Sequence, residues 1–273
     1  MIPQTLHAIL EEEYPLHPDV IRAYQRDGHT HLRGVLPATS VELFRPRLQD
    51  VVREVYSKRS TEKRTEDYST LFHQIANVWR HDDQLREFVF ARRFAKIAAE
   101  LMGVRGVRLY HDQALFKPPG ATKTPFHQDQ FYWPLDSPNT ITMWMPLVNV
   151  SAATGAMMFA TGSHREGPLI AKSISEKAGE EFEELVRKRN YPVASYELKA
   201  GDATFHSGWV IHGAHSNTGV DPREVLTIIY YEDGARLVEP ETQYRKVDME
   251  AFHPGQRPGE PAASPLNPLL YTT

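Results

Sequence analysis

The stretch that decides the fold and the site of this chain reads Thr124-Pro125-Phe126-His127-Gln128-Asp129-Gln130-Phe131-Tyr132-Trp133-Pro134. It places an imidazole, a carboxylate two positions later and a run of aromatic side chains in one short segment. Side chains alternate between the two faces of a β-strand, so a strand here would put His127 and Asp129 on one face, about 7 Å apart. The stretch therefore predicts two ligands for one metal ion, with Gln128 turned away.

A His-x-Asp pattern is a weak signal by itself, because the chain contains it three times. The copy at residues 17–19 precedes a helical pattern, and Asp19 suits the first turn of a helix. The copy at residues 81–83 opens another helical pattern, in which residues two apart do not share a face. Only the copy at residues 127–129 lies in an aromatic, strand-like context, which favours it as the metal segment.

The third ligand is predicted to be His212. It shares one segment with His206 and His215, but only His212 follows a strand-like apolar run and precedes a glycine. Two histidines and one carboxylate leave coordination positions open, an arrangement typical of non-haem Fe(II) oxygenases.

An arginine follows His212 at a distance of eleven residues, at the entrance to a strong β-strand pattern over residues 225–231. A buried arginine requires a partner, and its planar guanidinium pairs with a carboxylate through two hydrogen bonds. A metal-bound dicarboxylic co-substrate would supply that partner for Arg223.

Composition narrows the class of protein. The chain has 273 residues, a net charge of −4 and no cysteine, which excludes a disulfide scaffold and thiolate ligands. No basic cluster indicates nucleic-acid binding, and no segment resembles a secretion signal or a membrane span. We expect a cytoplasmic enzyme, a monomer or homodimer, that binds a small molecule and neither nucleic acid nor membrane.

With these motifs in place, the sequence resembles the phytanoyl-CoA dioxygenase family of Fe(II)/2-oxoglutarate oxygenases from about residue 20 to residue 235. Motifs that match in family order are Asp27-Gly28-His29-Thr30-His31-Leu32-Arg33-Gly34-Val35-Leu36, Lys117-Pro118-Pro119-Gly120, His127-Gln128-Asp129, Gly162-Ser163-His164 and His212-Gly213 with Asn217 and Arg223. The order makes the set far more specific than any single motif. The resemblance implies that His164 is not an iron ligand.

The resemblance implies a mainly β fold with flanking helices, in which a double-stranded β-helix (a jelly roll) forms the core. We expect a single domain over residues 1–273, with the jelly roll at about 104–235, a helical N-terminal part at 16–103 and a proline-rich, loosely packed tail at 252–273.

The resemblance also implies the cofactors, namely Fe(II), 2-oxoglutarate as co-substrate and O2. His127, Asp129 and His212 would be the metal-binding and catalytic residues, and Arg223 would bind the far carboxylate of 2-oxoglutarate. Gln113 and Trp144 match co-substrate positions, with an interior hydrogen bond and core packing as their alternatives. Because Asp129 is present, hydroxylation is favoured over halogenation; desaturation and ring formation use the same triad.

For the substrate pocket, strand parity favours Phe131 and Trp133 over Tyr132, with Met157 and Trp209 as weaker candidates. The resemblance adds Gln74 and Asn77, for which helical packing is the alternative. His111 is interpreted as structural. A CoA thioester is disfavoured as substrate, since no basic cluster is present for its phosphates.

Local patterns predict further elements. Thr39 and Glu42 have the spacing of a capping box, Pro46 suggests a kink or a later helix start, and Gly103 suggests a left-handed helix end. Residues 57–67 read as a charged loop, with a lid as the alternative, and residues 174–190 as a charged helical insertion. Two strand patterns cover residues 107–117 and 140–150, and in the second Ile141, Met143, Met145 and Leu147 share one face while Thr142 and Trp144 share the other.

The rival to an oxygenase is a jelly roll that binds a metal without oxidising anything, such as an isomerase, a hydrolase or a sensor. Residue spacing does not select iron over zinc or manganese. Arg223 distinguishes the two, because a protein without a dicarboxylate co-substrate has nothing for it to bind. A third possibility is a jelly roll with a vestigial site.

Overall fold

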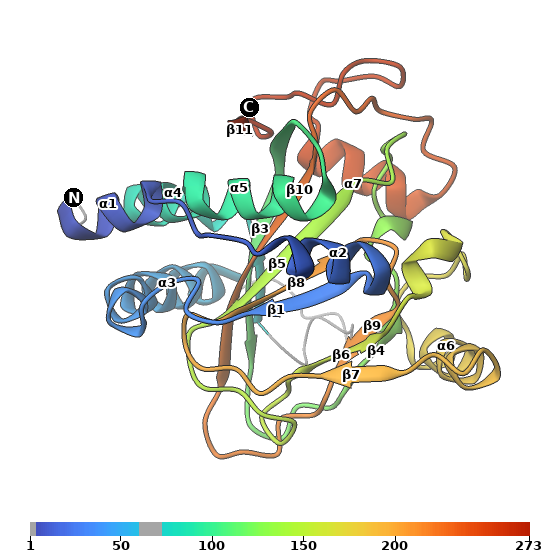
Figure 1. Ribbon diagram of the computed structural model, residues 1–273, viewed down its shortest axis with the longest axis horizontal. Helices are drawn as coiled ribbons and strands as arrows, with labels where there is room; N and C mark the ends of the chain where they lie inside the picture. The colour runs from blue at the N-terminus through green and yellow to red at the C-terminus, as the bar shows by residue number, and fades with distance from the viewer. Residues whose placement is uncertain (1–3, 60–72) are drawn as a thin grey trace.

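Two antiparallel sheets form the centre of the computed structural model, which describes residues 4–59 and 73–273 (Figure 1). The larger sheet has the strand order β1 (His29–Leu32), β8 (Ala203–Ser207), β5 (Thr140–Pro146), β10 (Arg223–Glu232), β3 (Gly106–Lys117) and β11 (Leu269–Thr272), and β2 (His73–Ala76) also pairs with β3. The smaller sheet has the order β4 (Thr124–His127), β9 (His212–Ala214), β6 (Met157–Ala160) and β7 (Val193–Ser195). The predicted mainly β, jelly-roll class is confirmed.

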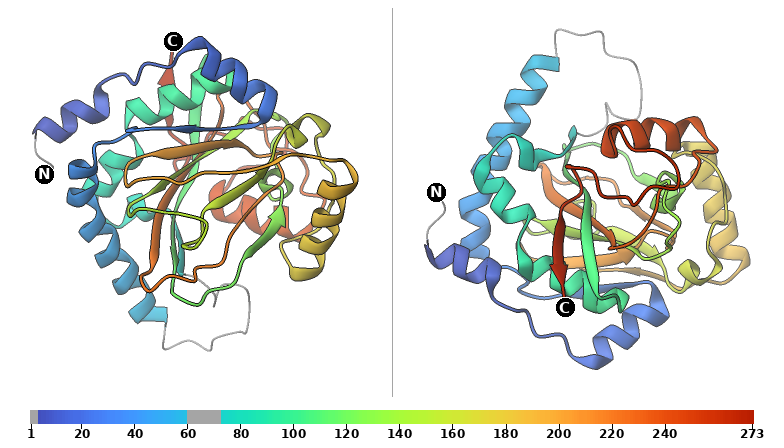
Figure 2. Two further views of the ribbon diagram at one scale, coloured as in Figure 1. Left: turned by 60° about the horizontal axis from the view of Figure 1, so that its bottom comes forward. Right: turned by 90° about the horizontal axis from the view of Figure 1, so that it is seen from above.

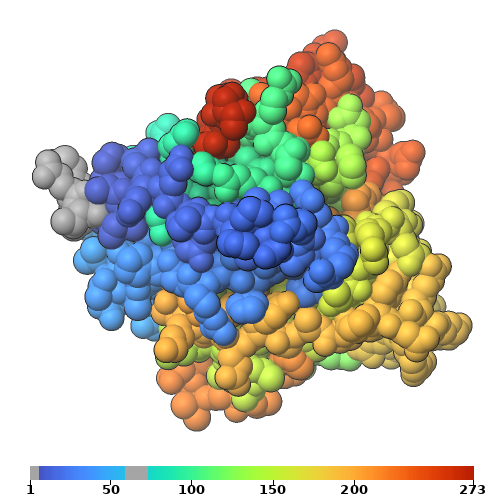
Figure 3. All heavy atoms as spheres, viewed as in Figure 1, coloured from blue at the N-terminus to red at the C-terminus, as the bar shows by residue number. Residues whose placement is uncertain are grey.

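Helices lie on both sides of the sheets (Figure 2). The N-terminal set is α1 (Gln4–Glu11), α2 (Pro18–Asp27), α3 (Ala38–Arg59), α4 (Asp83–Val89) and α5 (Arg92–Met102). The later helices are α6 (Glu176–Lys188) and α7 (Gln243–Phe252), and short 3₁₀ turns are η2 (Val78–Arg80), η3 (Asp129–Phe131) and η4 (Ser163–Glu166). In the space-filling view, N-terminal residues (blue) and the segment around α6 and β7 (gold) cover much of one face (Figure 3).

The main core lies between the N-terminal helices and the larger sheet. Ile141, Met143 and Met145 of β5 pack there with α5, while Thr142 and Trp144 face a cavity on the other side. This is the predicted alternation, which a strand produces because neighbouring side chains point to opposite faces. The sheet therefore has an apolar outer face that holds the helices and an inner face that carries functional side chains.

Helix ends follow the sequence in some places and not in others. α5 ends at Gly103 in the left-handed conformation (φ 73°), as predicted. The capping-box prediction is wrong, because α3 already begins at Ala38 and Thr39 lies inside it. The first turn instead bonds to the carbonyl of Pro37, and α3 continues through Pro46 without a later start.

The segment around Gln74 and Asn77 is a strand followed by a 3₁₀ turn, not a helix. β2 adds to the long strand β3, with Gln74 opposite Leu115. The predicted charged loop at 57–67 falls largely outside the described residues, and α3 extends through its first positions.

The C-terminal residues are more ordered than the proline pattern indicated. Thr242 precedes α7 as its N-cap, and its side chain accepts a hydrogen bond from the backbone N–H of Arg245. β11 then pairs with β3, and Asn267 is buried with its amide donating to the carbonyls of Leu109 and Tyr110. Tertiary contacts that a local pattern does not reveal hold this tail on the sheet. Among the described helices, none is both long and apolar enough to cross a membrane.

Candidate active site

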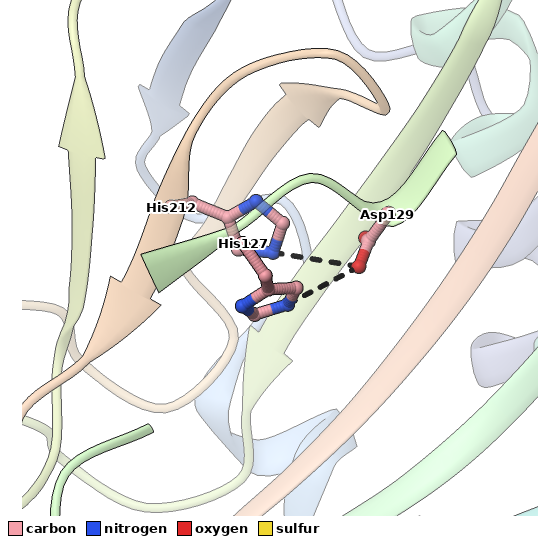
Figure 4. A group of neighbouring side chains, drawn as sticks. All are labelled: His127, Asp129 and His212. Atoms are coloured by element: carbon pink, nitrogen blue, oxygen red, sulfur yellow. Dashed lines mark ion pairs between the residues drawn. The ribbon is translucent and has the colours of Figure 1, made fainter. Parts of the chain in front are cut away.

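His127, Asp129 and His212 come together at the junction of β4, η3 and β9 (Figure 4). His127 and His212 are direct cross-strand partners in the smaller sheet. One ligand atom from each of the three residues lies within 4.8 Å of the others. They therefore form a group that can hold a metal ion.

The expectation that His127 and Asp129 share one face of a single strand is wrong. β4 ends at His127, Gln128 remains extended, and Asp129 begins the 3₁₀ turn η3. The turn brings the carboxylate back toward the two imidazoles, with its Oδ1 atom 3.3 Å from His127 Nε2 and 3.6 Å from His212 Nε2. The spacing of the residues was informative although the assumed backbone was not.

Backbone carbonyls orient both imidazoles. His127 Nδ1 lies 2.8 Å from the carbonyl oxygen of Pro125, and His212 Nδ1 lies 3.1 Å from that of Val210. Because a carbonyl oxygen only accepts, each Nδ1 carries the hydrogen, and Nε2, the ring atom that lies near Asp129, is the one available to a metal ion. Metal-binding histidines in proteins are held in the same way.

Electrostatics at the site favour an ionised Asp129 and a neutral His212. Burial works to raise the pKa of Asp129, but the facing His212 and His127 hold it well below its usual range. Burial and the neighbouring His127 lower the pKa of His212 well below its usual range. Neutral imidazoles and an ionised carboxylate are the protonation states that bind a divalent cation.

Gln128 points away from the metal group, as predicted. Its amide donates to the carbonyls of Gly167 (2.9 Å) and Trp209 (2.6 Å), and its side-chain oxygen accepts from the backbone of Leu169 (3.0 Å). This buried amide joins three segments behind the site and fixes the chain between His127 and Asp129.

His206 is a neighbour of the site that the sequence analysis did not single out. Its Nε2 atom lies 3.5 Å from Asp129 Oδ2, and its ring centroid is 4.3 Å from that of His212. It is 1% exposed, and neither ring nitrogen has a hydrogen-bond partner in the described part of the chain. The signal that could have found it was a histidine within the strand-like segment Ala203–Ser207, six residues before His212.

The metal group opens into a cavity of about 650 Å³ between the two sheets. Six of the further residues predicted for the co-substrate or the substrate line this cavity, namely Gln74, Gln113, Trp133, Trp144, Met157 and Arg223. His111, interpreted from the sequence as structural, lines it as well.

Arg223 lies at the start of β10, opposite Lys117 of β3. It is 4% exposed, one Nη atom donates to the carbonyl of Gly155 (2.9 Å), and its guanidinium carbon lies 5.2 Å from the centre of the Trp144 ring. Lys117 is also buried and donates to the carbonyl of His215. Burial, with the nearby Arg223 charge, lowers the pKa of Lys117 to about 7. Of these two residues Arg223 lines the cavity, so an anion at this end would meet its guanidinium.

Two residues predicted for the substrate pocket lie elsewhere. Phe131 is not among the residues that line the cavity, and Tyr132 lines it instead, because η3 replaces the expected strand and changes which side chains face inward. Asn77 does not line the cavity either; its left-handed backbone (φ 56°) starts η2, and its side chain accepts a hydrogen bond from the Trp79 indole. Trp209, one of the two weaker candidates, is also absent from the lining.

One wall of the cavity comes from a helix that the sequence analysis missed. Tyr244, Asp248 and Phe252 of α7 line the same cavity as the metal group. They are spaced four residues apart, which places them on one face of the helix. This spacing was visible in the sequence, but the surrounding residues gave it no clear apolar stripe.

Comparisons with known proteins agree with this geometry. The family model described as phytanoyl-CoA dioxygenase (PhyH) matches residues 24–225. Ectoine dioxygenase of Bordetella parapertussis is 24% identical over 241 residues, which cover 79% of this chain and 75% of that protein.

Solved structures show the same fold. The non-heme α-ketoglutarate-dependent carbocyclase SnoK of nogalamycin biosynthesis has a TM-score of 0.76 at 24% identity, covering 93% of this chain and 96% of that one. The epimerase SnoN, in complex with Fe3+, α-ketoglutarate and nogalamycin RO, has a TM-score of 0.72 at 25% identity, covering 92% of this chain and 97% of that one.

The fold and the site together define an iron- and 2-oxoglutarate-dependent oxygenase. The family match over residues 24–225 shows that the chain belongs to the phytanoyl-CoA dioxygenase family.

Proposed function

We propose that this protein hydroxylates an unactivated carbon of a small organic substrate, with conversion of 2-oxoglutarate to succinate and carbon dioxide. One observation carries the proposal: His127, Asp129 and His212 converge within 4.8 Å on the cavity that Arg223 also lines. A metal group and a buried guanidinium in one cavity suit a co-substrate that chelates at one end and carries a carboxylate at the other.

The donor set fits a ferrous ion. His127 Nε2, His212 Nε2 and Asp129 Oδ1 would hold it and leave positions for the co-substrate and O2. When bound, the ion and 2-oxoglutarate supply the oxidising power for the reaction, while the protein supplies orientation and electrostatics.

Arg223 is proposed to bind the far carboxylate of 2-oxoglutarate. The bond to Gly155 and the Trp144 ring fix the guanidinium in place before the co-substrate arrives, so little conformational freedom is lost on binding. Gln113 and Trp144 line the same cavity and would contact the co-substrate along its length. An ion pair formed in this buried setting is stronger than one at the surface.

Hydroxylation is favoured over halogenation because a carboxylate, Asp129, occupies the position where related halogenating enzymes carry a small residue. The carbocyclase and epimerase that share the fold make ring formation and epimerisation the alternatives within the same enzyme class. The product distinguishes them, since only hydroxylation leaves an oxygen atom from O2 on the substrate.

The test is a screen of small metabolites for succinate release by the iron-loaded enzyme, followed by analysis of the product formed under ¹⁸O₂. The expected result is a substrate that stimulates succinate release and gains one ¹⁸O atom. Asp129→Ala should abolish this turnover, whereas Asp50→Ala, which removes an exposed partner of Arg53, should keep it. Full turnover in Asp129→Ala would show that the ligand is misassigned.

The rival reading is a jelly roll that binds a metal and does not oxidise. It predicts that metal-loaded protein has no specific affinity for 2-oxoglutarate. The position of Arg223 in the same cavity as the metal group favours the oxygenase, because a planar guanidinium suits the carboxylate of a dicarboxylic co-substrate.

A further inference from the structure

We propose that the substrate carries an organic ammonium group, which pairs with the carboxylate of Asp248 at the α7 side of the cavity. The inference rests on the proposed function and names the chemical class of substrate for that same cavity. Three features support it: the Asp248 carboxylate, the aromatic rings near it and the charges of the residues that line the cavity.

Asp248 is presented to the cavity by the one face of α7 that faces inward. Tyr244 lies one turn before it and Phe252 one turn after it, and all three line the cavity. The Tyr244 hydroxyl accepts a hydrogen bond from Ser173 (2.9 Å), and the Phe252 ring packs on His111 with 4.2 Å between ring centres. Contacts on either side therefore fix the position of the carboxylate.

A β-bulge supplies the partner that orients this carboxylate. The pairing of β3 with β10 shifts register between Ile229 and Tyr230, so Tyr110 has no cross-strand partner in β10. As a result Tyr110 joins the inner cluster with Ile229, next to His111 on the cavity side. The Tyr110 hydroxyl donates a hydrogen bond to Asp248. Bulges near active sites commonly re-aim a side chain in this way.

Asp248 forms no salt bridge with a lysine or arginine in the described part of the chain. Arg245, one turn earlier on α7, uses its Nε atom to donate to the carbonyl of Phe131 (3.0 Å). Burial raises the pKa of Asp248 to about 7, against the lowering effect of the Tyr110 hydrogen bond. A cation brought by a ligand would stabilise the ionised carboxylate that burial disfavours.

The rings around Asp248 suit a cation as well. Tyr132, Trp133, Tyr244 and Phe252 all line this part of the cavity, and the Tyr132 and Tyr244 rings meet edge to face with centres 6.0 Å apart. Aromatic faces attract an ammonium group through their quadrupole, most strongly where water is excluded. A carboxylate beside several such rings is a recognition site for an organic cation rather than for an anion.

The charges around the whole cavity also favour a substrate with an ammonium group. In the loaded enzyme, the two positive charges of a ferrous ion and the charge of Arg223 balance Asp129 and the two carboxylates of 2-oxoglutarate. Asp248 is then the remaining ionisable carboxylate among the lining residues. A substrate ammonium group would complete the balance, whereas a substrate carboxylate there would meet repulsion.

The test compares three probes of one shape, namely benzylammonium, benzyl alcohol and benzoate, against enzyme loaded with Fe(II) and 2-oxoglutarate without oxygen. Binding is measured by ligand-observed NMR. The expected result is that benzylammonium binds at least about tenfold more tightly than benzyl alcohol, as suits a charged hydrogen bond, and that benzoate binds most weakly. Asp248→Asn should remove the preference for the cation.

Tyr110→Phe is the matched variant, because it removes the hydroxyl partner and keeps the carboxyl group, which a bound cation can still hold in its ionised form. It should keep the preference for benzylammonium, and it leaves the proposal testable if Asp248→Asn fails to fold. Equal binding of benzylammonium and benzyl alcohol by the wild type, or an unchanged preference in folded Asp248→Asn, would overturn the proposal. Calorimetric binding of 2-oxoglutarate by Fe(II) enzyme of the same preparation, before the co-substrate is added, separates this failure from a failure of the proposed function.

Discussion

The imidazoles of His127 and His212 owe their orientation to two backbone carbonyls, each two residues earlier in the chain. A local contact of this kind belongs to the short motif itself, which is why residue types and order were enough to predict the metal group. The identity of the pocket-lining residues depended on backbone shape. The 3₁₀ turn at Asp129 replaced a strand, and with it Tyr132 replaced Phe131 in the cavity wall.

A prediction at this scale concerns the pH dependence of stability. The pKa of Asp248 is raised to about 7 in the folded protein, compared with about 3.9 for an unperturbed Asp. The folded state therefore keeps a proton that the unfolded chain releases, and the free energy of unfolding falls as the pH rises from about 4 to 7. Asp248→Asn cannot ionise, so its melting temperature relative to wild type should rise across this interval.

The measurement is thermal unfolding of metal-free protein at several pH values. Tyr110→Phe is the control. It removes the hydrogen bond that lowers the Asp248 pKa, so the free energy of unfolding of this variant should keep falling to a higher pH than that of the wild type. Parallel profiles for wild type and Asp248→Asn would contradict the environment assigned to this carboxylate.

Among the elements, the long strands were the most predictable. The strand patterns predicted over residues 107–117 and 140–150 lie over β3 and β5, and β5 shows the apolar period of two that is typical of a strand. α7 was not predictable, because it packs through a few residues and none of its side chains is fully enclosed. Its position is set by partners distant in the sequence, such as Tyr110 and Ser173.

The contact between α6 and β4 gives a prediction at the scale of elements. A Cβ atom at Gly179 of α6 would lie 2.5 Å from Pro125 Cβ, and the Pro125 carbonyl holds the ring of His127. Gly179→Ala should therefore destabilise the protein by about 1–3 kcal/mol through overpacking, against a gain of about 1 kcal/mol in helix propensity. It should also weaken metal binding.

Urea unfolding and a metal titration check this prediction. Glu180→Ala is the matched control on the same helix, since Glu180 is exposed and its loss should change stability by no more than about 0.5 kcal/mol. A Gly179→Ala protein that gains stability and binds metal as the wild type does would show that α6 does not constrain the metal strand.

In the molecule as a whole, the C-terminal residues complete both the larger sheet and the cavity. β11 covers the edge of β3, and Tyr271 is buried there beneath the Arg92 guanidinium, 4.7 Å from its ring centre. The sequence suggested a loose tail because its prolines interrupt any regular pattern. Prolines limit local structure, but they do not prevent a short strand from pairing at an exposed edge.

Deletion of residues 269–273 should therefore lower stability without removing the metal group, which lies on the other sheet. Loss of the buried Tyr271 side chain and of the β3 edge pairing should cost at least about 1.5–3 kcal/mol. Leu269→Ala, at a half-exposed position of β11, should have little effect. Unchanged denaturant unfolding of the deletion variant would contradict the role given to β11.

We propose above all that His127, Asp129 and His212 hold a ferrous ion beside an arginine that binds 2-oxoglutarate. The most direct measurement is a titration of 2-oxoglutarate into the anaerobic Fe(II) protein, followed through the visible metal-to-ligand absorption band. We predict that the wild type develops the band, that Asp129→Ala does not, and that Arg223→Ala binds iron normally but needs far more 2-oxoglutarate. Absence of the band in iron-loaded wild type, or equal loss of iron and 2-oxoglutarate binding in Arg223→Ala, would contradict it.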